Sequence, residues 1–186
     1  METLDRKTII AALADLNDRL RELGIVGDLC LYGGGTMVVA FNARLSTQDV
    51  DAVFQPAAII RKAAAAIAEE RGLKADWLND GVKGWLSSKE RLVPENLPQF
   101  SHLRLTRPTE RYLLAMKCLA ARAAGFETQG DRKDIVFLVR ALGLRTADEV
   151  LKIVEDFYPE DRIQPKTRFL VEEIMNEVAQ EGLSPE

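Results

Sequence analysis

The chain has 186 residues, with 25 Lys and Arg, 29 Asp and Glu and one His, so its formal net charge is −4. This length suits one domain, or a domain with a helical extension, that buries a core without disulfides or structural metals. Hydrophobic residues make up 47% of the chain and charged residues 29%, which excludes a disordered or collagen-like chain. The mild acidity argues against a protein that coats nucleic acid through bulk charge.

Cysteine content and apolar run lengths indicate the compartment. Cys30 and Cys118 lie in apolar runs and are expected to be reduced core thiols. The N-terminal METLDRKTII lacks the basic, apolar and small-residue order of a signal peptide. The longest apolar runs are too short to span a bilayer. We therefore expect a cytoplasmic protein with no membrane partner.

Hydrophobic spacing predicts the first elements. Apolar residues three and four positions apart predict a helix over residues 4–23. The run IVGDLCLY, residues 25–32, predicts a strand, and three glycines at 33–35 follow it. A short buried helix, TMVVAFNA, is expected after the glycines, and RLSTQ reads as a polar connection.

The next segments predict a second strand, a helix and a third strand. Acidic and apolar residues alternate over 49–54, which is typical of a strand. Pro56 opens an alanine-rich helix that Gly72 closes. A loop with an Asn-Asp-Gly turn signal is expected over 73–99, and HLRLT, residues 102–106, predicts a third strand.

Four helices are predicted after residue 107. The last-but-one begins with a capping box formed by Thr146 and Glu149. The chain is thus expected to be α+β, with an α/β portion over 1–106 and a helical portion over 107–186 that packs on the same core. The four segments are TERYLLAMKCLAARAAG, DRKDIVFLVRALG, TADEVLKIVEDFY and KTRFLVEEIMNEVAQEG.

Two acidic residues on the second strand are the first candidate site. Asp49 and Asp51 are two positions apart, so a strand places both carboxylates on one face, about 7 Å apart at Cα. Unpaired, they repel one another. Mg²⁺ resolves this repulsion, because it takes carboxylate oxygens and leaves room for substrate phosphates.

The glycine run between the first strand and the short helix is the second candidate site. Gly34, Gly35 and Thr36 place bare backbone N–H groups at a helix start, where phosphate binds well. The run lacks the GK[ST] of a Walker loop and the GxGxxG of a dinucleotide fold. A solvated strand face and an ordinary turn would explain each motif alone, but their combination favours a phosphate and metal site.

Lys117 stands out on an otherwise apolar predicted helix. A buried ammonium needs an acidic partner or a phosphate, although a lysine at the core edge can also extend its amine to water. Asp134 precedes the apolar run IVFLV, so its side chain is expected to face inward. Asp131 shares that helix face at i and i+3, but an acid at a helix start is also expected for capping alone.

These residues together resemble the nucleotidyltransferase superfamily. Its signature is a Gly-Gly or Gly-Ser turn, a short helix and a [DE]-h-[DE] strand, and Gly34, Gly35, Asp49 and Asp51 fall on those positions. The chain is most similar to bacterial abortive-infection-type nucleotidyltransferase toxins and related uncharacterised proteins, over residues 28–175. The matching motifs are Arg44 with TQDVD, Lys117 with Arg122, and Asp131 with Asp134.

The resemblance implies a fold and a set of roles. The fold is a small mixed sheet flanked by helices with a C-terminal helical part. Asp49 and Asp51 bind Mg²⁺, while Gly34, Gly35 and Thr36 hold the β- and γ-phosphates of an NTP. Arg44 and Lys117 neutralise triphosphate charge. Asp134, with Asp131 beside it, supplies a third acid in place of the strand carboxylate that HLRLT lacks.

The implied activity is Mg²⁺-dependent transfer of an NMP group from an NTP to an acceptor. The acceptor is tRNA, another RNA or a protein, and the chain is then the toxin of a toxin–antitoxin pair with an antitoxin partner. The alternative is an inactive nucleotide-binding or protein-interaction module on the same fold. His102, Trp77 and Trp85 are read as structural before any role as general base or base-stacking residues.

Overall fold

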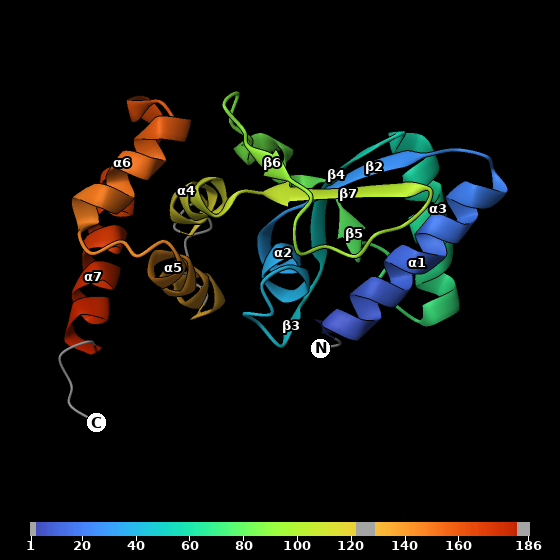
Figure 1. Ribbon diagram of the computed structural model, residues 1–186, viewed down its shortest axis with the longest axis horizontal. Coiled ribbons are helices and arrows are strands. Elements are labelled where there is room, and N and C mark those ends of the chain that lie inside the picture. Colours follow the sequence, from blue (N-terminus) through green and yellow to red (C-terminus); the bar gives the residue numbers. More distant parts are fainter. Residues whose placement is uncertain (1–2, 122–128, 182–186) are drawn as a thin grey trace. The chain divides into compact units, whose positions relative to one another are not determined.

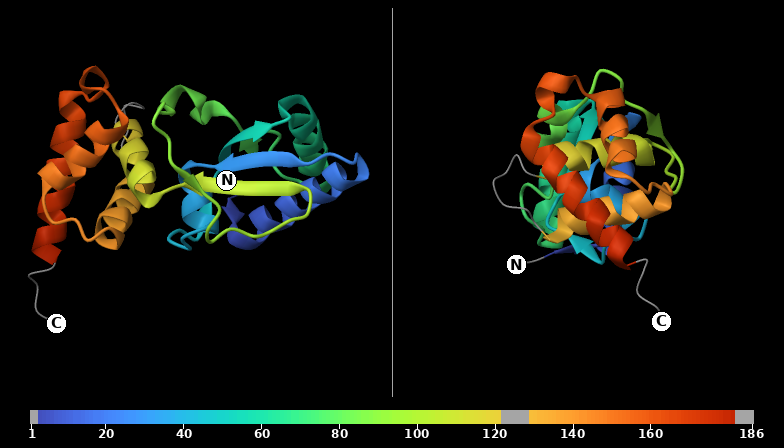
Figure 2. Two further views of the ribbon diagram at one scale, coloured as in Figure 1. Left: turned by 45° about the horizontal axis from the view of Figure 1, so that its top comes forward. Right: turned by 90° about the vertical axis from the view of Figure 1, so that its left-hand side faces the viewer.

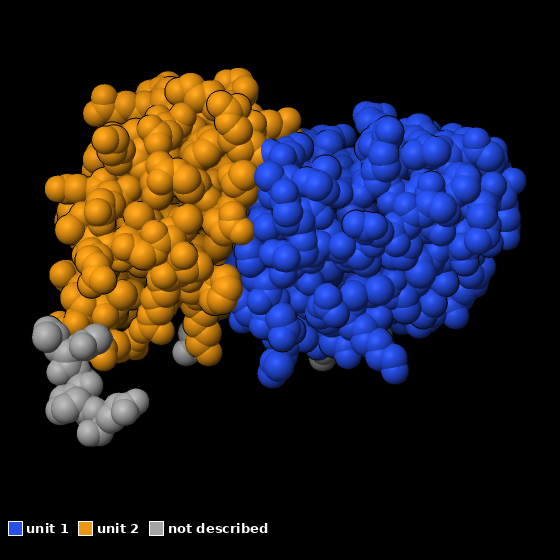
Figure 3. All heavy atoms as spheres, viewed as in Figure 1, with its two compact units in different colours: residues 1–84, 92–108 blue, residues 85–91, 109–186 orange. Residues whose placement is uncertain are grey.

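The computed structural model of the protein describes residues 3–121 and 129–181, which form two compact units (Figure 3). The first unit comprises Met1–Gly84 and Leu92–Pro108, and the second comprises Trp85–Arg91 and Thr109–Glu186. The strands and the first three α-helices belong to the first unit, and the last four α-helices belong to the second (Figure 1). The mixed sheet, its flanking helices and the C-terminal helices confirm the expected α+β class.

A five-stranded mixed sheet organises the first unit. Its order is β5-β4-β2-β7-β6, with β2 at the centre, antiparallel to β4 and parallel to β7 (Figure 2). The outer strands are short: β5 runs parallel to β4, and β6 runs antiparallel to β7. The strands are β2 (Gly27–Leu31), β4 (Val50–Gln55), β5 (Leu78–Asn79), β6 (Leu92–Val93) and β7 (Leu103–Pro108).

Three helices pack with the sheet around one hydrophobic core: α1 (Arg6–Glu22), α2 (Gly33–Val39) and α3 (Ala57–Arg71). The first and third of these also pack against one another. In α1 the spacing of Ile9, Leu13, Leu16 and Leu20 buries all four side chains, as their periodicity predicts. The core-facing residues of the sheet include Leu29, Leu31, Val50, Ala52, Phe54, Leu103 and Leu105.

A separate two-stranded sheet ties the N-terminal segment to the first unit. Strand β1 (Leu4–Asp5) pairs antiparallel with β3 (Ser46–Thr47), and Leu4 lies opposite Thr47. Asp5 then caps α1, because its carboxylate accepts the backbone N–H of Thr8 at 2.7 Å. The predicted helix start at residue 4 was wrong, because Leu4–Asp5 forms strand β1 and the helix begins at Arg6. The segment RLSTQ, predicted as a polar connection, contains strand β3.

Four helices form the second unit, with α4 packed against the other three. The capping box of Thr146 and Glu149 is confirmed at the start of α6. Trp85–Arg91 joins this unit: the Ser87 backbone N–H donates to Tyr112 Oη at 2.8 Å. The helices are α4 (Glu110–Ala120), α5 (Gln129–Ala141), α6 (Ala147–Phe157) and α7 (Pro165–Glu181).

Two further sequence predictions differ from the structure. The glycine run is the first turn of α2 and not a separate turn. The Thr36 backbone N–H donates to the carbonyl of Tyr32, the residue before the helix. The predicted loop over 73–99 contains the edge strands β5 and β6 and a 3-10 helix, η1 (Gly81–Trp85). Among the described helices, none is both long and apolar enough to cross a membrane.

Candidate functional site

The acidic pair lies on β4 and at its entrance. Asp49 directly precedes the strand, and Asp51 is its second residue. Val50, Ala52 and Phe54 point into the core, so the alternation of the strand sends Asp51 to the opposite face. Both acids are half-buried. The structure therefore places Asp51 on β4 and Asp49 immediately before it, so the predicted strand begins one residue later than expected.

The glycine turn lies directly against Asp51. Gly33 has a φ of +56°, and a β-carbon on it would lie 2.7 Å from Asp51 Oδ2. A β-carbon on Gly34 would lie 2.5 Å from Thr47 Oγ1. A β-carbon at Gly33 would displace the Asp51 carboxylate, and one at Gly34 would displace the Thr47 hydroxyl on β3. Gly33 was not among the predicted site residues, yet it is the glycine in contact with the acid.

Gly35 and Thr36 face the core. A β-carbon on Gly35 would lie 3.3 Å from Val50 Cγ1, so this glycine packs the helix onto β4. Thr36 is fully buried, and its hydroxyl donates to the carbonyl of Leu31 at 2.8 Å. The hydroxyl thus joins α2 to the end of β2 and does not face solvent. The Thr36 hydroxyl is therefore not a candidate phosphate ligand. The remaining candidates are the backbone N–H groups of the first turn, which have no acceptor within a helix.

Arg44 lies beside the same turn. Its Nη1 atom is 3.3 Å from the position of a β-carbon on Gly34, next to Thr47 Oγ1. The pairing of β3 with β1 holds the segment that follows Arg44. The structure therefore brings Gly34, Arg44 and Asp51 to one place, as the sequence predicts.

Asn79 and Asp76 are neighbours of Asp49 that sequence reasoning missed. Asn79 Nδ2 donates to Asp49 Oδ2 at 3.2 Å. Burial raises the pKa of the Asp49 carboxyl above its usual range, and the nearby Asp76 charge raises it further, while Asn79 and Lys74 oppose the shift. Asn79 was read as part of a turn signal, and its strand of two residues is too short to show any alternation.

The donor set of this site fits Mg²⁺. Two carboxylates are hard oxygen ligands, and Mg²⁺ is commonly held by one or two of them together with substrate phosphates. Burial and the nearby Asp76 charge disfavour the Asp49 anion, and a bound divalent cation would stabilise it. Over residues 3–121 and 129–181, no group of three or more His, Cys, Asp or Glu side chains is arranged to hold a metal ion.

The second unit holds the other predicted residues as an ion-paired triad. Lys117 on α4 is buried, with its Nζ atom 2.9 Å from Asp131 Oδ1 and 2.8 Å from Asp134 Oδ2 on α5. Asp134 is 1% exposed, so its predicted inward orientation is present. Asp131, the weaker candidate in the sequence, contacts the lysine as closely. The acidic partner that a buried ammonium needs is thus supplied by two carboxylates one helical turn apart.

The predicted site residues therefore fall into two groups, one in each unit. Those of the first unit cluster around the glycine turn and the start of β4, and those of the second form the triad. Arg122, named with Lys117 in the sequence motif, lies outside the described residues. The first group is Gly34, Gly35, Thr36, Arg44, Asp49 and Asp51, and the second is Lys117, Asp131 and Asp134.

The aromatic and histidine candidates have structural contacts. Trp77 is fully buried and its indole N–H donates to the Ala64 carbonyl at 3.0 Å, which holds the loop to α3. The His102 backbone N–H donates to Asn17 Oδ1 at 2.8 Å, and its ring contacts Ser101. Asp80 forms ion pairs with Arg61 and Lys83 at the surface.

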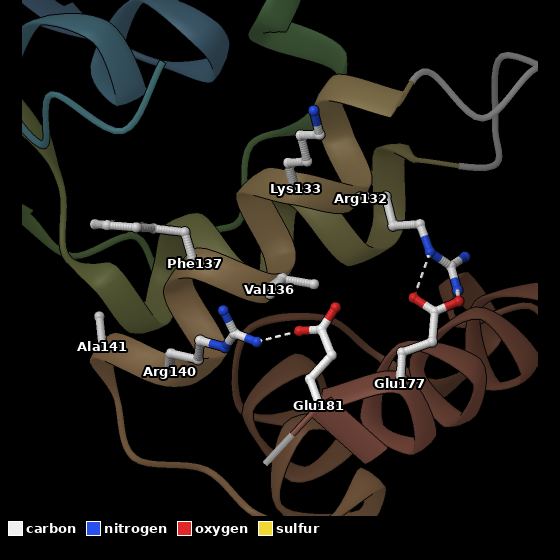
Figure 4. Close-up of a pocket in the computed structure, with 8 residues that line it drawn as sticks. All are labelled: Arg132, Lys133, Val136, Phe137, Arg140, Ala141, Glu177 and Glu181. Carbon is white, nitrogen blue, oxygen red and sulfur yellow. Dashed lines mark hydrogen bonds and ion pairs between the residues drawn. The ribbon is translucent and has the colours of Figure 1, made fainter. Parts of the chain in front are cut away.

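A groove lies between α5 and α7 in the helical unit (Figure 4). Its floor includes Val136, and ion pairs join Arg132 to Glu177 and Arg140 to Glu181 across it. These acids neutralise both arginines, so the groove is not a strongly basic surface. None of the predicted site residues lines it.

Comparison of the chain with models of known protein families, with curated proteins and with solved structures found no match.

Proposed function

We propose that the protein is a Mg²⁺-dependent nucleotidyltransferase that moves an NMP group from an NTP to an RNA or protein acceptor, on the superfamily's fold. The observation that carries the proposal is the contact between the acidic strand and the glycine turn. The Asp51 carboxylate lies against Gly33, Arg44 lies beside Gly34, and Asp49 directly precedes the strand that carries Asp51. Metal ligands, phosphate donors and a cationic side chain are thus adjacent in one unit.

Each group in this unit has a role that its chemistry suits. Asp49 and Asp51 would hold Mg²⁺, which when bound supplies positive charge to the phosphates and to the leaving pyrophosphate. The N–H groups of Gly34 and Gly35 would donate to phosphate oxygens. The Arg44 guanidinium would pair with the triphosphate, where its planar donors suit phosphate geometry.

The resemblance extends the proposal to the triad of the second unit. By the resemblance, Lys117 would neutralise triphosphate charge and Asp134 would be a third acid. Asp131 shares the lysine with it. The resemblance alone supports the RNA or protein acceptor and an antitoxin partner.

One observation favours a second candidate, a nucleotide-binding module without turnover. Strand β7 carries no carboxylate, and Asn79, level with Asp51 on the neighbouring strand, is a neutral amide. The candidate site therefore has two acids, Asp49 and Asp51, where polymerases of the superfamily use three. Such a site would hold Mg²⁺ and an NTP without transferring the nucleotide.

Incubation with radiolabelled NTPs, Mg²⁺ and total RNA, and separately with cell protein, tests the proposal. Label in RNA or protein that disappears in the Asp51→Ala variant is the expected result. The matched control is Asp28→Ala, since Asp28 is an exposed carboxylate on the same sheet, paired with Arg104. Binding of NTP with no transfer to either acceptor would favour the module. Equal labelling by Asp51→Ala and the parent protein would overturn the site.

A further inference from the structure

We propose that Asn79 is a positioning residue that orients the Asp49 carboxylate for Mg²⁺, an inference that rests on the proposed function. Asn79 comes from β5, at one edge of the sheet, and its Nδ2 atom donates to Asp49 Oδ2 at 3.2 Å. Its role would be to fix one carboxylate oxygen while the carboxylate binds the cation. Carboxylates that ligate metals are commonly held in this way by a hydrogen-bond donor.

The register of the sheet places Asn79 next to both acids. Strand β5 runs parallel to β4, with Asn79 opposite Asp51 and Leu78 opposite Val50. Neighbours at one level of a sheet lie on one face, so Asn79 shares the face of Asp51 while its side chain reaches back to Asp49. Asn79 is thus level with Asp51 in the sheet and hydrogen-bonded to Asp49, although β5 is only two residues long.

A turn on the other side of Asn79 fixes which end of its amide faces Asp49. The backbone N–H of Gly81 donates to Asn79 Oδ1 at 3.0 Å. An amide has one oxygen and one NH₂ group, so the oxygen that accepts from Gly81 leaves the NH₂ for the carboxylate. Both ends of the Asn79 amide are therefore hydrogen-bonded, its oxygen to Gly81 and its NH₂ group to Asp49.

The neutrality of Asn79 suits a metal ligand better than a cationic neighbour would. A Lys or Arg at this position would neutralise Asp49 and compete with the metal. An amide orients the carboxylate but leaves its charge in place, and burial together with Asp76 then makes that charge costly without a cation. Asn79 thus orients the Asp49 carboxylate and leaves its negative charge available to the metal ion.

Binding of Mn²⁺ alone to the whole protein, followed by electron paramagnetic resonance, tests this role without any enzymatic reaction. We expect Asn79→Ala to weaken the dissociation constant about 10-fold, the range found for such supporting groups. Asn79→Ser is the second variant, since its hydroxyl can still accept the Gly81 N–H but is too short to reach Asp49. It should lose the same affinity. Gln55→Ala, an exposed amide at the far end of β4, should bind as the parent protein does.

The outcomes separate this inference from the proposed function. Parent-like Mn²⁺ affinity in both Asn79 variants would overturn the positioning role and leave the site standing. Equal affinity of the parent protein and the Asp49→Ala/Asp51→Ala double variant would overturn the site itself, and the inference with it. In the transfer assay, loss of positioning raises the Mg²⁺ concentration for half-maximal rate, and excess Mg²⁺ restores the rate. A merely structural role would lower the maximal rate and leave that concentration unchanged.

Discussion

Asp51 and Gly33 are in contact across the gap between β4 and the start of α2: a β-carbon on Gly33 would lie 2.7 Å from Asp51 Oδ2. The glycine is in the left-handed region, with φ of +56°. Two independent constraints, backbone conformation and the space taken by the carboxylate, therefore select glycine here. The proximity of the Asp51 carboxylate to the start of α2 depends on this position.

Gly33→Ala should combine backbone strain with displacement of the Asp51 carboxylate. The strain costs about 1–2 kcal/mol of unfolding free energy, and the displaced ligand should weaken Mg²⁺-dependent NTP binding about 10-fold or more. Urea unfolding and nucleotide titration measure the two effects. The control is Gly72→Ala, in the same unit, where φ is +66° and no atom lies within 4 Å of the added carbon. Gly72→Ala should lose similar stability but keep its affinity, and equal affinities in the two variants would contradict the account.

We expect a large loss of stability when the Lys117 ammonium is removed from the triad. Lys117→Met removes the ammonium that lies 2.8 Å from the 1% exposed carboxylate of Asp134. Breaking a buried ion pair from one side costs about 3–5 kcal/mol, which urea unfolding followed by circular dichroism would detect. Lys133→Met, an exposed position on the same α5, should stay within about 0.5 kcal/mol of the parent. A similar, small change in both variants would contradict the burial of the triad's charges.

Asp49 should destabilise the metal-free protein at neutral pH. Its folded-state pKa is raised, so the folded protein binds this proton more tightly than the unfolded chain does. The penalty is absent below the unfolded pKa, near 3.8, and is complete above the folded pKa. Asp49→Asn should therefore raise the free energy of unfolding at pH 7 without metal, and the gain should vanish as the pH falls below the unfolded pKa.

Asp28→Asn is the control with the opposite sign. The ion pair with Arg104 lowers the pKa of Asp28, so this carboxylate stabilises the folded state above its unfolded pKa, and that stability is lost as the pH falls. The variant should be slightly less stable than the parent at pH 7. Thermal unfolding across the pH range compares the two. The same sign for both variants at pH 7 would show that burial does not govern Asp49.

The sequence predicts the long helices and central strands because their buried residues repeat with a clear period. Leu13 and Leu16 in α1, and Val50 with Ala52 in β4, are such positions. Strand β1 was missed because Leu4–Asp5 is too short to alternate, and its pairing with Ser46–Thr47 is a long-range contact.

The candidate site was predicted where residue type and local spacing decide it. Asp51 faces away from the core because it alternates with buried residues of β4, and Asp134 faces inward because an apolar run follows it. The contact of Gly33 with Asp51, the burial of the Thr36 hydroxyl and the bond from Asn79 depend on how distant segments pack. No local pattern encodes them.

The most direct measurement of the central claim is calorimetric titration of the purified protein with each NTP, with and without Mg²⁺. It should be repeated for the Asp49→Ala/Asp51→Ala double variant and for Asp28→Ala. The account predicts that the parent protein and Asp28→Ala bind at least one NTP only when Mg²⁺ is present, and that the double variant binds none. Mg²⁺-dependent binding that survives in the double variant, or no binding by the parent protein, would contradict it.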